Sequence, residues 1–239
     1  MESVNVICMK WGTRYGAHYV NRLFHGVKNN LNRQFRFVCF TDDDTGLEAG
    51  IESFPLPPIT IPEKHTVSPW RKLSLFSKDL ADLSGKTLFL DLDVIIVDSL
   101  DELFDYSENF SIIENWTQKG RGIGNSSVYC FNIGQHADIL EYYESNQDEV
   151  FANYSNEQIY LSLNIKDKQY WPEAWCKSFK FHAIPRGIKR LFVEPSIPNG
   201  CKIVVFHGYP NPDQAMVGDY GKKLRKYFKP ATWIEKYWV

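Results

Sequence analysis

The chain has 239 residues, of which 44% are apolar, 15% aromatic and 23% charged, with 27 Lys and Arg against 29 Asp and Glu. This composition predicts a folded globular chain and excludes an extended disordered one, and the net charge of −2 gives no reason to expect a nucleic-acid partner. No stretch approaches the roughly 18 consecutive apolar residues that a membrane span needs.

The N-terminal part of the sequence predicts a β-α-β unit. Val4–Met9 is apolar enough for a strand buried on both faces, Ala17–Asn30 carries apolar residues on one helical face, and Arg36–Phe40 forms the next strand. Both strands end in polar loops, Lys10–Gly16 and Thr41–Asp44. Ligands of open α/β sheets collect at the carboxyl ends of strands, so these loops are candidate binding loops.

The later elements predict an α/β fold with a mainly parallel, mixed central sheet flanked by helices. In chain order we expect extended chain over Ile51–Pro62, a helix over Arg71–Leu83, a strand over Thr87–Val97, a short helix over Ser99–Phe104, a strand over Ser127–Asn132, helices over His136–Tyr143 and Asn156–Leu163, an irregular stretch over Tyr170–Pro198 and a strand over Lys202–Phe206. We assign residues 1–218 to one domain and 219–239 to a basic-aromatic tail that docks as a helix.

Two features bear on the location of the protein. No basic, cleavable leader precedes the first apolar run. The five cysteines (Cys8, Cys39, Cys130, Cys176 and Cys201) form no CxxC pair and lie mostly in apolar runs, where reduced core thiols are expected. These features favour a cytoplasmic protein, peripheral at the inner membrane surface where its tail binds lipid.

Asp91 and Asp93 interrupt the most apolar strand of the sequence. An ionised carboxylate in such a run is costly unless a cation or hydrogen bonds compensate it. A spacing of two places both side chains on one face of a strand, where they suit a divalent cation that also holds phosphate oxygens. The alternative is a pair of strand-end carboxylates that cap the following turn.

Three further segments give this motif a family resemblance: Trp70–Leu75 before the strand, Asp98–Phe104 after it, and Val204–Pro212, which contains His207-Gly208. Together with Asp91 and Asp93 they resemble GT-A glycosyltransferases, most closely the family 8 type (glycogenin-like and bacterial galactosyltransferase-like enzymes). The resemblance implies a hexosyltransferase that moves a sugar from a UDP-sugar to a glycan, glycolipid or other hydroxyl acceptor, with retention of configuration. It also implies Mn²⁺ or Mg²⁺ held by Asp91, Asp93 and His207. A buried structural histidine is the alternative for His207.

The same resemblance implies a nucleotide-sugar site. Its residues would be Lys10, Trp11, Gly12, Tyr15, Asp42, Arg71, Asp91, Leu92, Asn125, Ser126 and Gly208. Tyr15 would stack on the base, and Lys72 could replace Arg71 because the register is uncertain by one residue. An N-cap or an Asx turn is the alternative for Asp42.

The catalytic candidates are Glu157 and Gln158, which resemble the family's residues at the head of a helix. Asn156 before them reads as a helix N-cap. An inverting enzyme would need a carboxylate base near the acceptor, for which Glu157, Glu173 and Asp213 are available. Trp171 and Trp175 are candidates for an acceptor-binding platform.

The tail alternates basic and aromatic residues: Lys222, Lys223, Arg225, Tyr227, Phe228, Trp233, Tyr237 and Trp238 are examples. Such segments bind anionic membrane surfaces or dock as terminal helices. Three other functions compete with glycosyl transfer. A haloacid-dehalogenase-like phosphatase would use Asp91 as nucleophile, although its motif normally opens the domain. A nucleotidyltransferase would need a Gly-rich, Lys-bearing loop that is missing here. A GT-A-like domain could bind glycans without catalysis.

Overall fold

The computed structural model describes residues 3–66, 68–222 and 226–239. Its strands are β1 (Val4–Lys10), β2 (Phe35–Thr41), β3 (Glu52–Pro55), β4 (Lys86–Leu90), β5 (Val94–Ile96), β6 (Ser111–Glu114), β7 (Gly124–Asn132), β8 (Gln169–Tyr170), β9 (Cys176–Ser178) and β10 (Ile203–Val205). Its α-helices are α1 (Ala17–Asn30), α2 (Asp101–Asp105), α3 (Ala137–Ser145), α4 (Gln147–Asn153), α5 (Glu157–Asn164), α6 (Pro212–Val217) and α7 (Ile234–Tyr237). The short helices η1 (Glu63–His65), η2 (Pro69–Phe76) and η4 (Gly187–Leu191) are 3₁₀ helices, and η3 (Phe179–Ala183) is a π-helix.

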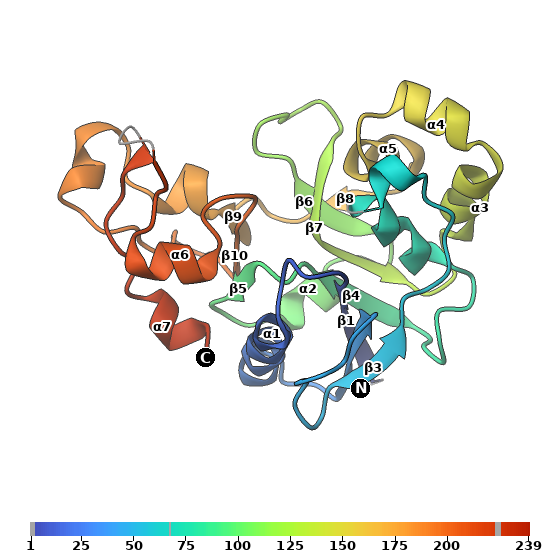
Figure 1. Cartoon of the computed structure of the whole chain (residues 1–239), viewed down its shortest axis with the longest axis horizontal. Coiled ribbons are helices and arrows are strands. Elements are labelled where there is room, and N and C mark those ends of the chain that lie inside the picture. The colour runs from blue at the N-terminus through green and yellow to red at the C-terminus, as the bar shows by residue number, and fades with distance from the viewer. Residues whose placement is uncertain (1–2, 67, 223–225) are drawn as a thin grey trace.

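A seven-stranded sheet with the order β3-β2-β1-β4-β7-β6-β8 organises the chain. The strands β3, β2, β1 and β4 are parallel, whereas β7 is antiparallel to both β4 and β6. This is the predicted mixed, mainly parallel sheet. Helices α1 and α2 lie on one side, while η2 and α3–α5 lie on the other (Figure 1). The two hydrophobic clusters of the core fill these two layers, so both faces of the sheet are buried.

The predicted strand Thr87–Val97 is in fact two strands in two sheets. β4 ends at Leu90, and Asp91–Asp93 form a turn before β5 begins at Val94. β5 belongs to a second sheet with the order β5-β10-β9. The prediction of one strand was wrong because the apolar run continues through the turn without a break in hydrophobicity. The two carboxylates therefore lie at the junction of the two sheets rather than within a strand.

Two other predicted elements differ from the structure. The helix expected over Arg71–Leu83 is the 3₁₀ helix η2, which starts at Pro69 and ends at Phe76. The stretch Tyr170–Pro198, expected to be irregular, contains the short elements β9, η3 and η4. Strand β6 and helices α4 and α6 were not expected, since they are short and their apolar residues are few.

The described residues of the tail pack on the body of the protein. Phe228, Ile234 and Trp238 are buried within the first hydrophobic cluster. The indole of Trp238 lies 5.0 Å from the ring of Tyr19 on α1, measured between ring centroids. Lys223 and Arg225 lie outside the described residues. Among the described residues, no helix combines the length and the apolar character that crossing a membrane requires.

Candidate functional site

A cavity of about 330 Å³ opens where the loop after β1 meets the turn after β4 and the start of η2. The predicted residues that line it are Trp11, Gly12, Tyr15, Asp91, Leu92 and Asp93. Met9, Thr13, Arg14, Pro69 and Lys72 complete the lining. Ligand pockets in proteins have volumes of about 300 to 1,000 Å³. Its position at the carboxyl ends of parallel strands is the one expected for a ligand site of this sheet type.

Asp91 and Asp93 lie side by side on the wall of this cavity but have different surroundings. The side chain of Asp91 is partly exposed and lies 2.7 Å from the ammonium of Lys72. Asp93 is buried and accepts a hydrogen bond of 2.9 Å from the hydroxyl of Tyr15. Burial and the charge of Asp91 raise the pKa of Asp93 to about 7. Without a bound cation, a negative charge on Asp93 in addition to that on Asp91 is therefore poorly compensated.

Lys72 is the basic residue that reaches the carboxylates. It is buried, and its ammonium also donates to the carbonyl of Ser126, at 3.2 Å. Burial lowers the pKa of Lys72, but the charges of Asp91 and Glu157 outweigh burial and leave the pKa raised. Arg71, the first choice from the sequence, does not line the cavity. The alternative register therefore describes the geometry better.

Ser126 on β7 connects this centre to the head of α5. Its hydroxyl donates to a carboxylate oxygen of Glu157 at 2.6 Å, and its amide N–H donates to the side-chain carbonyl of Gln158 at 3.1 Å. Asn156 caps α5 by accepting from the amide of Ile159, as predicted. The catalytic candidates thus lie one hydrogen bond from a residue that contacts Lys72. Glu157 is buried, so it is a positioning residue in this geometry rather than an exposed base.

The remaining predicted residues brace the loops around the cavity. The amide of Gly12, at φ +61°, donates to a carboxylate oxygen of Asp42 at 2.9 Å. Lys10 is buried and donates to the carbonyl of Asp43 at 2.7 Å. Asn125 accepts from the amide of Ser127. All three side chains are therefore engaged with backbone groups, and the bonds of Asp42 and Lys10 tie the loops after β1 and β2 together.

The backbone of His207 lies near Asp93, whereas its side chain is directed toward Ser178. The amide of Phe206 donates to the carbonyl of Asp93 at 3.0 Å, which places the next residue beside the turn. The imidazole Nε2 lies 2.7 Å from the hydroxyl of Ser178, and the ring stacks on Trp116. Burial and the charge of Lys180 lower the pKa of His207 to about 4. The imidazole is thus neutral at physiological pH, the form that ligates metals.

The predicted metal ligands Asp91, Asp93 and His207 do not form one cluster of ligands in this structure. Within residues 3–66, 68–222 and 226–239, no three His, Cys, Asp or Glu side chains are placed so that they could hold a metal ion. The donor chemistry nevertheless fits Mn²⁺ or Mg²⁺, since the charge of Asp91 raises the cost of ionising Asp93 and a neutral imidazole follows Phe206. Gly208, at φ +67°, adopts a backbone conformation that glycine favours, immediately after His207.

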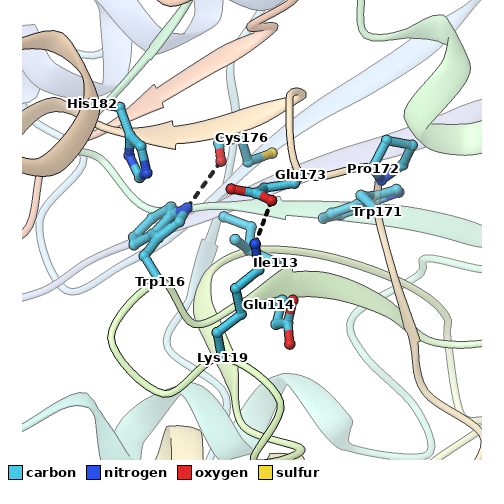
Figure 2. A pocket seen from close by; sticks show the side chains of 9 residues that line it. All are labelled: Ile113, Glu114, Trp116, Lys119, Trp171, Pro172, Glu173, Cys176 and His182. Atoms are coloured by element: carbon cyan, nitrogen blue, oxygen red, sulfur yellow. Dashed lines mark hydrogen bonds and ion pairs between the residues drawn. The ribbon is translucent and has the colours of Figure 1, made fainter.

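A second, smaller pocket of about 90 Å³ lies between the β6–β7 loop and the segment from Trp171 to His182 (Figure 2). The indole N–H of Trp116 donates to the carbonyl of Cys176, and Lys119 pairs with Glu173 across the opening. Trp171 lines this pocket and is buried, with its indole nitrogen unpartnered. The volume suits several water molecules or one polar edge of a larger ligand.

Trp175 is not part of this pocket. Its ring contacts Tyr106 edge-on and lies 5.3 Å from the ammonium of Lys202. Trp171 and Trp175 therefore have different surroundings, and their joint role in acceptor binding stays a prediction. The difference was not predictable, because both side chains belong to one Trp/Pro-rich run whose backbone turns between them. Arg14 and Lys180 were likewise not predicted, although Arg14 falls within the loop singled out after β1.

The raised pKa of Asp93 predicts a pH-dependent stability. The unfolded carboxyl titrates near its ordinary pKa of about 4, whereas the folded one titrates at about 7. Between these values the folded state holds the extra proton, so the contribution of Asp93 to the free energy of unfolding of the metal-free protein should fall as the pH rises from about 4 to about 7, by up to about 4 kcal/mol. The lowered pKa of His207 acts in the opposite direction over much of this range, so urea unfolding with EDTA present compares the wild type with Asp93→Asn. The variant should gain stability relative to the wild type as the pH rises, and identical pH profiles of the two proteins would contradict the assignment.

Comparisons with solved structures identify the fold. The galactosyltransferase LgtC, solved with donor and acceptor sugar analogues, is similar with a TM-score of 0.61 and 15% identity over 97% of this chain and 94% of LgtC. An active-site mutant of LgtC gives a TM-score of 0.58 and 16% identity over 87% of this chain and 89% of that one. The apo form of the glycosyltransferase GlyE from Streptococcus pneumoniae TIGR4 gives 0.58 and 16%, over 88% of this chain and 56% of GlyE.

The chain thus has the GT-A fold of these glycosyltransferases, as its sequence predicts. Comparison with models of protein families finds no match, and comparison with curated proteins finds no significant one. At 14 to 16% identity the similarity establishes the fold, and the activity has to be argued from the site.

Proposed function

We propose that the protein is a metal-dependent glycosyltransferase that moves a hexose from a UDP-sugar to a glycan, glycolipid or other hydroxyl acceptor. One observation carries this proposal: the two carboxylates Asp91 and Asp93 line a cavity at the sheet's ligand edge, with the buried cation Lys72 against one of them. A negatively charged diphosphate could enter such a site only with added positive charge. Mn²⁺ or Mg²⁺, held by Asp91, Asp93 and His207, would supply that charge and stabilise the leaving diphosphate.

The protein's own groups would position the donor. Tyr15, which lines the cavity, would stack on the uracil ring, and Arg14 lies 5.0 Å from the Tyr15 ring, where its guanidinium can meet phosphate oxygens. Lys72 would hold Asp91 and lend positive potential to the diphosphate as charge develops. Gln158 and Glu157, anchored on Ser126, would fix the β7 loop against the donor sugar.

Retention of configuration is part of the proposal. An inverting reaction needs a carboxylate base beside the acceptor hydroxyl. Glu173 is held by Lys119 and Lys177, Asp213 accepts from Tyr19, and Glu157 is buried. None of these three carboxylates lines the cavity at Asp91 and Asp93. The acceptor would enter from the side of Trp171, whose unpartnered indole N–H can donate to a sugar hydroxyl.

A haloacid-dehalogenase-like phosphatase remains the second candidate, with Asp91 as nucleophile. Against it, Asp91 is ion-paired to Lys72 and the motif follows the fourth strand of the chain rather than the first. The experiment that separates the two functions measures UDP release from UDP-glucose and UDP-galactose with Mn²⁺, and phosphate release from p-nitrophenyl phosphate. UDP release supports glycosyl transfer, whereas phosphate release alone overturns it. Donor binding without turnover on a wide acceptor panel would indicate a non-catalytic domain.

His207→Ala is expected to raise the Mn²⁺ concentration needed for half-maximal activity by about tenfold, because one neutral nitrogen ligand is lost from a set of three. The fold should survive, since the imidazole's partner Ser178 can bond to water. Metal titration of UDP-sugar hydrolysis measures the effect, with His25→Ala on the exposed face of α1 as the control. An unchanged metal requirement would remove His207 from the site.

A further inference from the structure

A protruding turn between η3 and β10 exposes a cluster of apolar side chains. Ile188, Phe192 and Val193 expose 72%, 71% and 52% of their surface, and Leu191 exposes 43%. Four large apolar side chains are thus exposed within six consecutive residues. Figure 1 shows this segment, in orange, at the edge of the molecule away from the large sheet and next to the C-terminal segment. Exposed apolar surface concentrated in this way is typical of an interaction site.

Hydrogen bonds hold this turn in place. At its base, the amide of Ser196 donates to the carbonyl of Ala183 at 3.1 Å. At its flank, the hydroxyl of Thr232 donates to Glu194 at 3.0 Å, and the ammonium of Lys229 donates to the carbonyl of Phe192. The C-terminal tail therefore holds the turn through these two hydrogen bonds. The apolar side chains are exposed because a fixed backbone presents them, which lowers the entropic cost of binding through them.

The charge around the turn has one sign. From residue 174 to residue 193 the sequence has no acidic residue, and it has five basic ones: Lys177, Lys180, Arg186, Lys189 and Arg190. Within the described part of the chain, no carboxylate forms an ion pair with Arg186, Lys189 or Arg190. Glu194 at the end of the turn is bonded to Thr232. Exposed cations therefore flank the apolar side chains directly.

The tail adds few apolar groups to this surface. Lys226 is exposed, and its charge contributes to lowering the pKa of Lys180, whose ammonium donates to the carbonyl of His207. Phe228 and Trp238, by contrast, are buried in the core. Two of the tail's aromatic residues, which we expected to bind a membrane, are thus packed in the core of the protein instead. The exposed apolar residues are those of the turn.

We propose that the turn from Arg186 to Val193 is the surface by which this protein docks on an anionic lipid bilayer. Ile188 and Phe192 would enter the boundary between headgroups and acyl chains, while Arg186, Lys189 and Arg190 contact lipid phosphates. Apolar anchors and cations that act together give stable but reversible attachment, since neither alone is sufficient. The proposal concerns a surface outside the cavity and does not depend on the proposed transferase activity.

Vesicle co-sedimentation of the full chain tests this proposal. We expect binding to vesicles of phosphatidylcholine with phosphatidylglycerol, little binding to phosphatidylcholine alone, and weakening by salt. The double variant Ile188→Ser/Phe192→Ser should bind anionic vesicles at least about tenfold more weakly. Lys189→Gln/Arg190→Gln should weaken binding and reduce the salt dependence. Val217→Ser, which changes an exposed apolar residue on α6, is the matched control and should bind like the wild type.

Three results would overturn the proposal: a wild-type chain that ignores anionic vesicles, an Ile188→Ser/Phe192→Ser variant that binds as well as the wild type, or a wild-type dimer that the same variant converts to monomer without any vesicle affinity. The last result, seen by light scattering, would assign the turn to a second copy of the chain. UDP-sugar hydrolysis in solution should be equal in the wild type and the variant. A failure of membrane binding is thereby distinguishable from a failure of the proposed activity.

Discussion

Asp93→Asn is expected to lower the turnover of a UDP-sugar by at least about a thousandfold while raising the stability of the metal-free protein. Both effects have one cause. The carboxylate of Asp93 is buried beside Asp91, which raises its pKa to about 7, so its negative charge is costly in the absence of a cation. Asparagine keeps the size of the side chain and can still accept from the hydroxyl of Tyr15. It removes the charge that would hold a divalent cation.

The measurement combines steady-state UDP release with urea unfolding at a pH of about 8 in EDTA, where the wild-type carboxylate is largely ionised. Asp98→Asn is the matched control, since Asp98 is exposed beyond β5 and accepts from the amide of Ser99. The control should retain both activity and stability. An Asp93→Asn protein with full activity would show that the carboxylate has no role in catalysis, and a destabilised one would show that its charge is compensated in the folded state.

Lys72→Met is expected to have the opposite effect on stability, lowering the free energy of unfolding by about 3 kcal/mol. The methionine fills a similar volume but leaves Asp91 without its partner at 2.7 Å and the carbonyl of Ser126 without a donor. Activity should fall as well, because the group that orients Asp91 toward the cavity is lost. Mn²⁺ should restore part of the lost stability, since a bound cation replaces the missing positive charge.

Lys86→Met is the control for this variant, because Lys86 pairs with Glu108, whose side chain is 91% exposed. An exposed pair of this kind contributes at most about 1 kcal/mol. Chemical denaturation with and without Mn²⁺ distinguishes the two lysines. The Lys72→Met variant could instead be as stable as the wild type, or gain no more stability from Mn²⁺ than the wild type does. Either result would show that the ion pair between Lys72 and Asp91 does not stabilise the site.

The sequence predicted those features that depend on local pattern. Val4–Met9 is uninterrupted and apolar, so a strand buried on both faces was foreseeable. Asp91 and Asp93 are recognisable as candidate site residues because a charged side chain in an apolar run is costly unless a cation or hydrogen bonds compensate it. Asn156 is a foreseeable N-cap because its side chain follows a turn and precedes a helical pattern. From these features we could predict the edge of the sheet at which a ligand would bind, and the position of the two carboxylates at that edge.

Features that depend on non-local packing were not predictable. The break between β4 and β5 is invisible in hydrophobicity, because each half is buried in a different sheet. Whether Arg71 or Lys72 reaches Asp91 depends on η2 being a 3₁₀ helix, which turns its side chains by about 120° per residue instead of about 100°. The orientation of His207 toward Ser178 and the separation of Trp171 from Trp175 likewise follow from contacts between distant segments.

Binding of a uridine diphosphate and a divalent cation in the cavity at Asp91 and Asp93 is measurable by a thermal-shift titration with UDP, GDP, ADP and their common sugars, each with and without Mn²⁺. We expect the melting temperature to rise with UDP and UDP-sugars only when Mn²⁺ is present, and the Asp93→Asn variant to lose this response. The absence of a shift with every nucleotide, in wild-type protein that is folded and saturated with Mn²⁺, would contradict the proposed binding.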